Sequence, residues 1–181
     1  MSNVLIGIIG VILFIGLALA GALFLGPRFQ AATIDSKAAA AVQGMQQLAH
    51  AMTLMRINEG KAYDANLSLL PGTNPETSPV SRGYLKTLPK SPVNSAYDPF
   101  MVDATSNRSG EPKFSVITLS PSGDTVGESV CLNIVRRTGQ DPEATVVPAL
   151  SAIPDKPVGC IRLVGGDLLM SPGYFYVFAR M

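Results

Sequence analysis

The N-terminal part of the chain is the feature that most constrains its fold. From Val4 to Leu25 the sequence is an unbroken run of 22 apolar or glycine residues, and no charged side chain occurs between Ser2 and Pro27. As an α-helix this run would extend roughly 33 Å, which is about the thickness of a bilayer's hydrocarbon core. In lipid a helix is the expected form, because it satisfies its backbone polar groups internally. The run therefore predicts a membrane-spanning helix over residues 1–27.

A cleaved signal peptide is the alternative interpretation of this segment. Signal peptides carry basic residues ahead of a shorter apolar stretch and end at a small-x-small cleavage site. Here the first basic residue is Arg28, and the candidate cleavage site Ala18-Leu19-Ala20 lies inside the apolar run. We therefore expect a retained helix.

Glycines in the apolar run are candidate positions for close contact between helices. They stand at Gly7, Gly10, Gly16, Gly21 and Gly26. Small residues allow the backbones of membrane helices to approach one another. Glycine is also common in membrane helices generally, so self-packing and simple background composition both remain open.

Residues 28–60 predict an amphipathic helix that continues into the globular domain. Its apolar residues recur in alternating steps of three and four, which is a helical period: Ala38, Ala41, Met45, Leu48, Met52 and Met55. Gly60 is a natural C-terminal stop. The helix either begins afresh at a cap on Thr33 or Asp35, or runs on from the membrane through a kink at Pro27. We expect one kinked helix over 3–58, with the apolar seam packed on the chain's own sheet.

Residues 61–181 predict a proline-rich segment followed by a small antiparallel sheet. The seven prolines of residues 61–112 exclude long helices, while apolar residues would anchor the segment to a core: Tyr63, Leu67, Leu69, Leu70, Tyr84, Leu85, Leu88, Tyr97 and Phe100. Short β-branched or aromatic runs then predict strands at Phe114–Leu119, Ser129–Val135, Cys160–Val164 and Tyr174–Ala179. Ser122-Gly123-Asp124 fits a tight connection between the first two. The expected fold class is α+β.

The two cysteines, Cys131 and Cys160, lie 29 positions apart on two of the predicted strands. Behind a membrane anchor, in an oxidising compartment, we expect them to form a disulfide. Two buried free thiols are the alternative. A bridge would contribute roughly 3–4 kcal/mol in the chain-entropy model and would tie down Arg136–Gly159, which we expect to be a long exposed loop.

Composition argues against catalysis and against nucleic acid as a partner. Lys and Arg number 14 against 13 Asp and Glu, for a net charge of +1, and the basic residues are scattered rather than gathered on one segment. The one histidine, His50, falls within the amphipathic helix with no nucleophile motif near it. We expect no catalytic residues, no metal and no cofactor, and therefore a structural or binding protein.

The order of these elements resembles the type IV pilin family: an apolar helix, an amphipathic continuation, a small sheet and a late cysteine pair. The segment from Gly83-Tyr84-Leu85 to Tyr97-Asp98-Pro99-Phe100 is similar to the loop of pilins and of type II secretion pseudopilins. The resemblance implies a subunit that spans the bacterial inner membrane once, N-terminus inside, before assembly. It then implies an extracellular helical filament, with further copies of the chain and the pilus assembly machinery as partners.

One position departs from the family pattern. Most pilins carry a glutamate as the fifth residue of the mature chain, and here, if Met1 begins it, that position is Leu5. Helix packing would then depend on apolar contacts and the glycines. The alternatives are a type II secretion pseudopilin or minor pilin, and a single-pass membrane-anchored periplasmic binding domain that does not polymerise.

Overall fold

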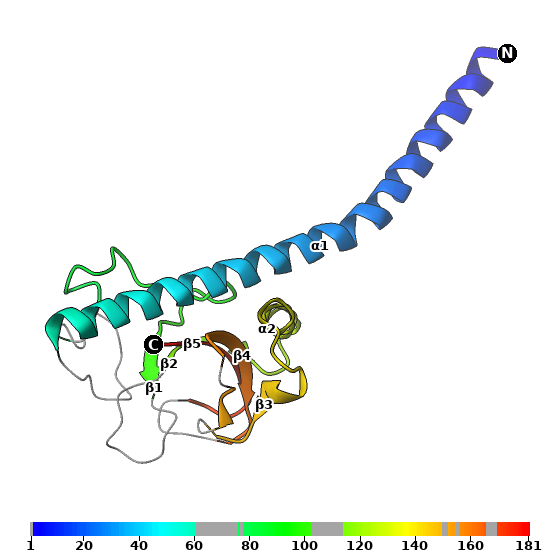
Figure 1. Cartoon of the computed structure of the whole chain (residues 1–181). Coiled ribbons are helices and arrows are strands. Elements are labelled where there is room, and N and C mark those ends of the chain that lie inside the picture. Colours follow the sequence, from blue (N-terminus) through cyan, green and yellow to red (C-terminus); the bar gives the residue numbers. More distant parts are fainter. Residues whose placement is uncertain are drawn as a thin grey trace.

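A computed structural model describes residues 2–60, 76, 78–102, 114–149, 152–154, 156–165 and 170–181. It contains one very long helix, a five-stranded sheet and a second, shorter helix (Figure 1). The long helix lies along the domain with its C-terminal half and projects away from it with its N-terminal half. This is an α+β fold.

The first helix, α1, runs without interruption from Ser2 to Glu59 and so joins the two predicted helical segments. It continues through Pro27, so neither Thr33 nor Asp35 caps a separate helix. A discrete kink at Pro27 stays a prediction. The helix ends as expected at Gly60, which adopts a positive φ of 61° and donates its N–H to the carbonyl of Arg56 at 3.0 Å.

The sheet has the strand order β1-β2-β5-β4-β3. Its strands are β1 (Phe100–Val102), β2 (Phe114–Pro121), β3 (Val146–Val147), β4 (Val158–Leu163) and β5 (Tyr174–Arg180). Three of the four predicted strands are therefore confirmed. The pairs β1–β2, β2–β5 and β4–β5 are antiparallel, whereas β3 pairs parallel to β4, so the sheet is mixed and not wholly antiparallel as predicted.

The predicted strand Ser129–Val135 is wrong, because this segment belongs to the helix α2 (Thr125–Thr138). The signals for a helix lie at its two ends. The carboxylate of Asp124 accepts a hydrogen bond from the N–H of Val126 at 3.0 Å, and Gly139 closes the other end in the left-handed conformation. The turn Ser122-Gly123-Asp124 consequently connects β2 to this helix.

The core consists of two layers, one on each face of the sheet. On one face α1 and α2 pack against alternate residues of the strands, such as Ile117, Val177 and Cys160. Every residue of the predicted apolar seam of α1 is buried there, which confirms the seam. On the other face a second cluster gathers the residues of opposite parity, such as Val116, Phe178 and Ile161.

Of the proline-rich segment the structure describes residue 76 and residues 78–102, which form turns and bends up to β1. Tyr84, Leu85 and Leu88 pack against the first core cluster as expected. Arg82 makes two hydrogen bonds to the carboxylate of Glu59, at 2.9 and 2.7 Å, which attach this segment to the end of α1. Phe100 packs against the second core cluster, and the ring of Tyr97 lies edge-on to that of Tyr174 with their centroids 6.4 Å apart. Tyr63, Leu67, Leu69 and Leu70 lie outside the described residues.

The segment Arg136–Gly159 is not the long exposed loop that we expected. Its start completes α2, and it continues into the short 3-10 helix η1 (Glu143–Thr145) and the strand β3. Gln140, Thr145 and Val147 are buried. Prolines and glycines alone did not reveal these contacts, since burial depends on the rest of the fold.

Candidate functional site

The most conspicuous feature of the surface is the projecting part of α1, residues 6–29, which we call the stem. Its large apolar side chains are between 51% (Ile9) and 76% (Phe24) exposed. They are Ile6, Ile8, Ile9, Val11, Ile12, Leu13, Phe14, Ile15, Leu17, Leu19, Leu23, Phe24, Leu25 and Phe29. By length and composition α1 could cross a membrane, and its most apolar part is not buried against any of the residues that the structure describes.

The apolar surface of the stem must be covered by lipid or by protein, because its exposure to water is costly in free energy. A helix of this size and composition carries on the order of 1,500 Å² of apolar surface, and exposing it to water would cost tens of kcal/mol at about 25 cal/mol per Å². An exposed apolar surface of this size marks a site of contact with a membrane or with another protein.

Within the described part of the chain, the stem glycines pack against no other element. A Cβ built on Gly7, Gly10, Gly16, Gly21 or Gly26 meets no atom within 4 Å beyond the helix's own backbone. At 3.6 residues per turn, Gly7, Gly10 and Gly21 fall within about 60° of one another around the helix, whereas Gly16 and Gly26 lie on other faces. The small residues are therefore available for contact from more than one side.

Two further sequence-predicted positions also lie in this helix. Leu5 belongs to α1, but its side chain lies outside what the structure describes. Pro27 lies inside α1 and is followed by the exposed Arg28. Because proline has no N–H, the carbonyl of Leu23 lacks its usual helical donor at this point.

The stem is connected rigidly to the domain, because the rest of α1 is packed on the sheet and on α2. Polar contacts across the α1–α2 interface add to the buried seam. Arg137 lies 3.5 Å from the carboxylate of Asp35 and donates to the side-chain oxygen of Asn133 at 2.8 Å, and Asn133 donates in turn to Asp35. These groups are partly exposed, so we assign the main stabilisation to the apolar seam.

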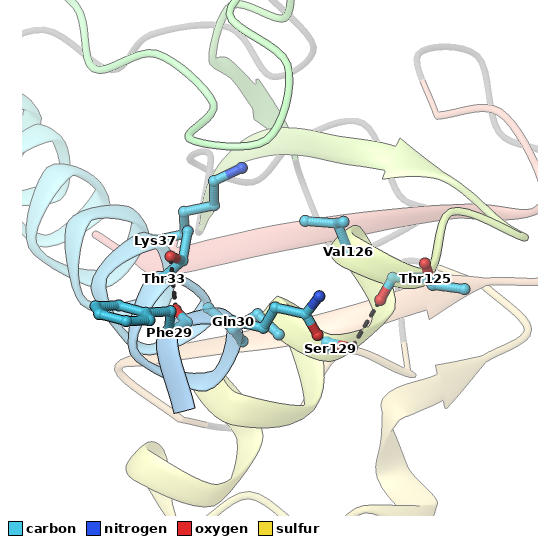
Figure 2. A pocket seen from close by; sticks show the side chains of 8 residues that line it. Phe29, Gln30, Thr33, Lys37, Thr125, Val126 and Ser129 are labelled. Atoms are coloured by element: carbon cyan, nitrogen blue, oxygen red, sulfur yellow. Dashed lines mark hydrogen bonds between the residues drawn. The ribbon is translucent and has the colours of Figure 1, made fainter. Parts of the chain in front are cut away.

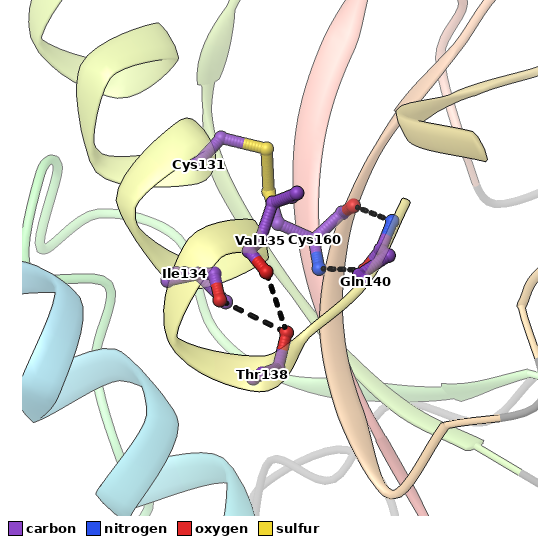
Figure 3. The surroundings of a disulfide bond; sticks show 6 residues. All are labelled: Cys131, Ile134, Val135, Thr138, Gln140 and Cys160. Carbon is purple, nitrogen blue, oxygen red and sulfur yellow. Dashed lines mark hydrogen bonds between the residues drawn. A yellow bond between two sulfur atoms is a disulfide. The ribbon is translucent and has the colours of Figure 1, made fainter. Parts of the chain in front are cut away.

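The cysteines form the expected disulfide, but they join a helix to a strand and not two strands. Cys131 in α2 and Cys160 in β4 are fully buried, with their Cα atoms 5.4 Å apart (Figure 3). The bond fixes α2 to the sheet on the same face as α1.

Gln140 supports this connection and was not found from the sequence. Its buried side chain donates to the carbonyl of Cys160 at 2.8 Å and accepts from the N–H of Cys160 at 3.1 Å (Figure 3). The carboxamide thus takes the place of a neighbouring strand at this edge of β4. The preceding glycine, Gly139, hinted at a turn but not at this contact.

The described residues offer little that resembles an active site. Within this part of the chain there is no group of three or more His, Cys, Asp or Glu side chains that could hold a metal ion. His50 is exposed on α1, on the side away from the buried seam. Burial raises the pKa of Tyr176 to about 12, and its hydroxyl donates to the carbonyl of Ser171 at 3.1 Å.

No protein-family model, curated protein or solved structure matches this chain. The features that bear on its function are thus the exposed stem and the rigid connection of the stem to the domain.

Proposed function

We propose that this chain is a structural subunit of an extracellular type IV pilus-like filament and that it polymerises through its stem. The observation that carries the proposal is the exposed apolar stem, which continues without a break into a helix packed on a disulfide-bonded domain. Such a subunit needs no catalytic residues.

Packing of many stems into one fibre core solves the energetic problem of leaving the membrane. In the bilayer, lipid covers the apolar side chains; in a fibre, neighbouring stems do. A contact between two different surfaces of the same subunit produces an open helical polymer when its rotation does not close into a ring. The rigid attachment of the stem to the domain would place the domains on the outside of that polymer.

The proposal also gives the partners and the location. Before assembly the subunit lies in the bacterial inner membrane, spanning it once with its N-terminus inside. The pilus assembly machinery then extracts it, and its neighbours in the filament are further copies of the same chain. If Met1 begins the mature chain, Leu5 stands at the position of the family glutamate, and packing between stems then depends on apolar contacts and on close approach at the glycines.

Electron microscopy of the fraction sheared from the cell surface tests this function, with an antibody to the globular domain as the label and cells lacking the gene as the control. Repeated labelling along thin fibres is the expected result. Labelling at fibre tips alone would indicate a minor subunit. Absence of fibres, with all of the protein left in the inner membrane, would contradict the proposal and favour a secretion pseudopilin or a membrane-anchored binding domain.

A further inference from the structure

A groove of about 480 Å³ lies where the stem joins the domain. One wall is α1, with Phe29, Ile34 and Lys37, and the other is the beginning of α2, with Val126 and Ser129 (Figure 2). We call it the stem-base groove.

We infer that the stem-base groove receives the apolar stem of a second copy of this chain. The inference rests on the proposed filament function and specifies a second surface for it. Each subunit would then contribute a stem to one neighbour and a groove to another, which is the unlike pairing that an open polymer requires.

Continuity with the stem is the first argument. Phe29 belongs to both surfaces, since it is the last large apolar residue of the stem, 68% exposed, and also lines the groove. Val126 lines the groove from α2 and is 39% exposed. The apolar surface of the stem thus extends onto the domain at this point.

Position along the helix is the second argument, and it favours protein over lipid as the occupant. The groove begins at Phe29, about 6 Å beyond the last residue of the apolar run, and extends about 12 Å further along the helix to Lys37. Acyl chains that surround residues 4–25 would end before it. Its length is close to the diameter of an α-helix with its side chains, about 10–12 Å.

The charges around the groove suit an apolar occupant. None of the described lining residues is acidic, and Lys37 is the charged one among them. Residues 6–27 of the stem carry no charged side chain, and Arg28 is the one charged residue of the stem. An incoming stem that enters the groove with its apolar run therefore brings no charge into it. A lysine can keep its ammonium group at the rim while its methylene groups cover an apolar neighbour.

The α2 wall is held in place before any partner arrives. Asp124 caps the helix, and the hydroxyl of Ser129 donates a hydrogen bond to the carbonyl of Thr125 at 2.7 Å. Gly127 lies so close to β2 that a Cβ there would meet the hydroxyl of Ser120 at 1.6 Å. A preformed wall reduces the entropy lost on binding.

The groove is too small to hold two subunits together by itself. A standard interface buries about 800 Å² on each partner. We assign the remaining area to contact between stems, so the groove determines how neighbours are placed and adds to a larger interface.

Two matched substitutions in α2 test the inference in cells that assemble the full-length protein. Val126 and Leu132 are both 39% exposed, but only Val126 lines the groove. We expect Val126→Arg to lower the labelled fibres in the sheared fraction at least tenfold and Leu132→Arg to leave them at the wild-type level. Purification in detergent, with the melting temperature and the disulfide measured, checks that both variants fold.

Cross-linking identifies the occupant. Cells expressing two forms of the chain, one with Val126→Cys and one with a cysteine in place of Leu17, Leu19 or Leu23, should yield intermolecular disulfides in fibres. Leu132→Cys should yield none. A fluorophore on Val126→Cys that reports apolar surroundings should respond on assembly, and a response already present in unassembled protein in vesicles would indicate lipid and overturn the inference.

The outcomes separate the two proposals. If wild-type cells form labelled fibres and Val126→Arg does not reduce them, or if Leu132→Arg reduces them equally, the groove inference is wrong and the filament function stands. If wild-type cells form no fibres, the proposed function itself is wrong.

Discussion

At the scale of single residues, Gln140 and Phe178 pack tightly against the backbone of β4. The carboxamide of Gln140 satisfies both backbone groups of Cys160. The neighbouring Gly159 leaves no room for a side chain, because a Cβ there would meet the Gln140 oxygen at 2.2 Å and the ring of Phe178 at 2.5 Å. Buried polar groups of this kind must be paired, since an unpaired one costs about 1–3 kcal/mol.

Replacing Gln140 by leucine should therefore destabilise the domain. The side chain stays similar in size, but the N–H and C=O of Cys160 lose their partners, so we expect unfolding to become easier by about 1–3 kcal/mol. Denaturant unfolding of the full chain in detergent, followed by tyrosine circular dichroism, measures this. Gln47→Leu, at an exposed position on α1, is the control and should change stability by less than about 0.5 kcal/mol. Equal stability of the two variants would contradict the role given to Gln140.

Tyr176 should make the domain sensitive to alkaline pH. Its pKa is raised to about 12 in the folded chain, mainly by burial, against 10.0 as the ordinary value. The unfolded chain therefore releases this proton first, and stability should fall as the pH rises from about 10 to about 12. Unfolding measured at several pH values should show a shallower decline for Tyr176→Phe than for the wild type. Parallel curves for the two proteins would show that Tyr176 is not responsible.

At the scale of elements, α2 connects the parts of the molecule. It packs on α1, it is bonded to β4 by Cys131–Cys160, and its beginning forms one wall of the stem-base groove. The stretch SVCLNIV predicts a strand because it is rich in β-branched residues, yet it forms part of this helix. The cap at Asp124 and the left-handed Gly139 lie outside those seven residues, and the buried positions Gly127, Val130, Cys131, Ile134 and Val135 recur with a helical period.

Removal of the disulfide should loosen α2 and weaken assembly. Cys131→Ser together with Cys160→Ser should lower the free energy of unfolding by roughly 3–4 kcal/mol in the chain-entropy model, since the bond closes a loop of 29 residues. The amount of subunit recovered in sheared fibres should fall as well. Mass analysis without reductant provides the control, because the wild-type chain must weigh two hydrogens less than the reduced one. Unchanged stability would contradict the stabilising role of the bond.

At the scale of the whole molecule, the two halves of α1 differ in what surrounds them. The C-terminal half buries its seam within the domain, and the stem leaves its entire surface for lipid or for other copies. Because one continuous helix joins them, the orientation of the stem follows that of the domain.

Closing the space at the stem glycines should prevent polymerisation without unfolding the domain. Gly10 and Gly16 lie about 120° apart around the helix, so Gly10→Leu with Gly16→Leu obstructs close approach on two faces. We expect labelled fibres to disappear while the melting temperature in detergent stays unchanged. The double alanine variant is the matched control and should still form fibres, because alanine remains small. Fibres at the wild-type level in the leucine variant would rule out packing through these glycines.

The sequence was enough to predict the helices and strands whose signals lie within a few neighbouring residues. The apolar run, the seam of period 3.5 and the stop at Gly60 determined α1, and β-branched or aromatic runs indicated β2, β4 and β5, because these signals depend only on neighbours along the chain. The cysteine pair could be predicted from its context, although the elements that carry it could not.

Tertiary structure alone decided the features that depend on distant partners. Three features join residues far apart in sequence: β3 pairs parallel to β4, Gln140 makes hydrogen bonds to the backbone of β4, and a groove lies between α1 and α2. No periodicity encodes such contacts, since each arises only when the core brings its elements together. The sequence by itself determined that this protein has an apolar helix in need of a partner; the fold decided which surface of the domain lies beside it.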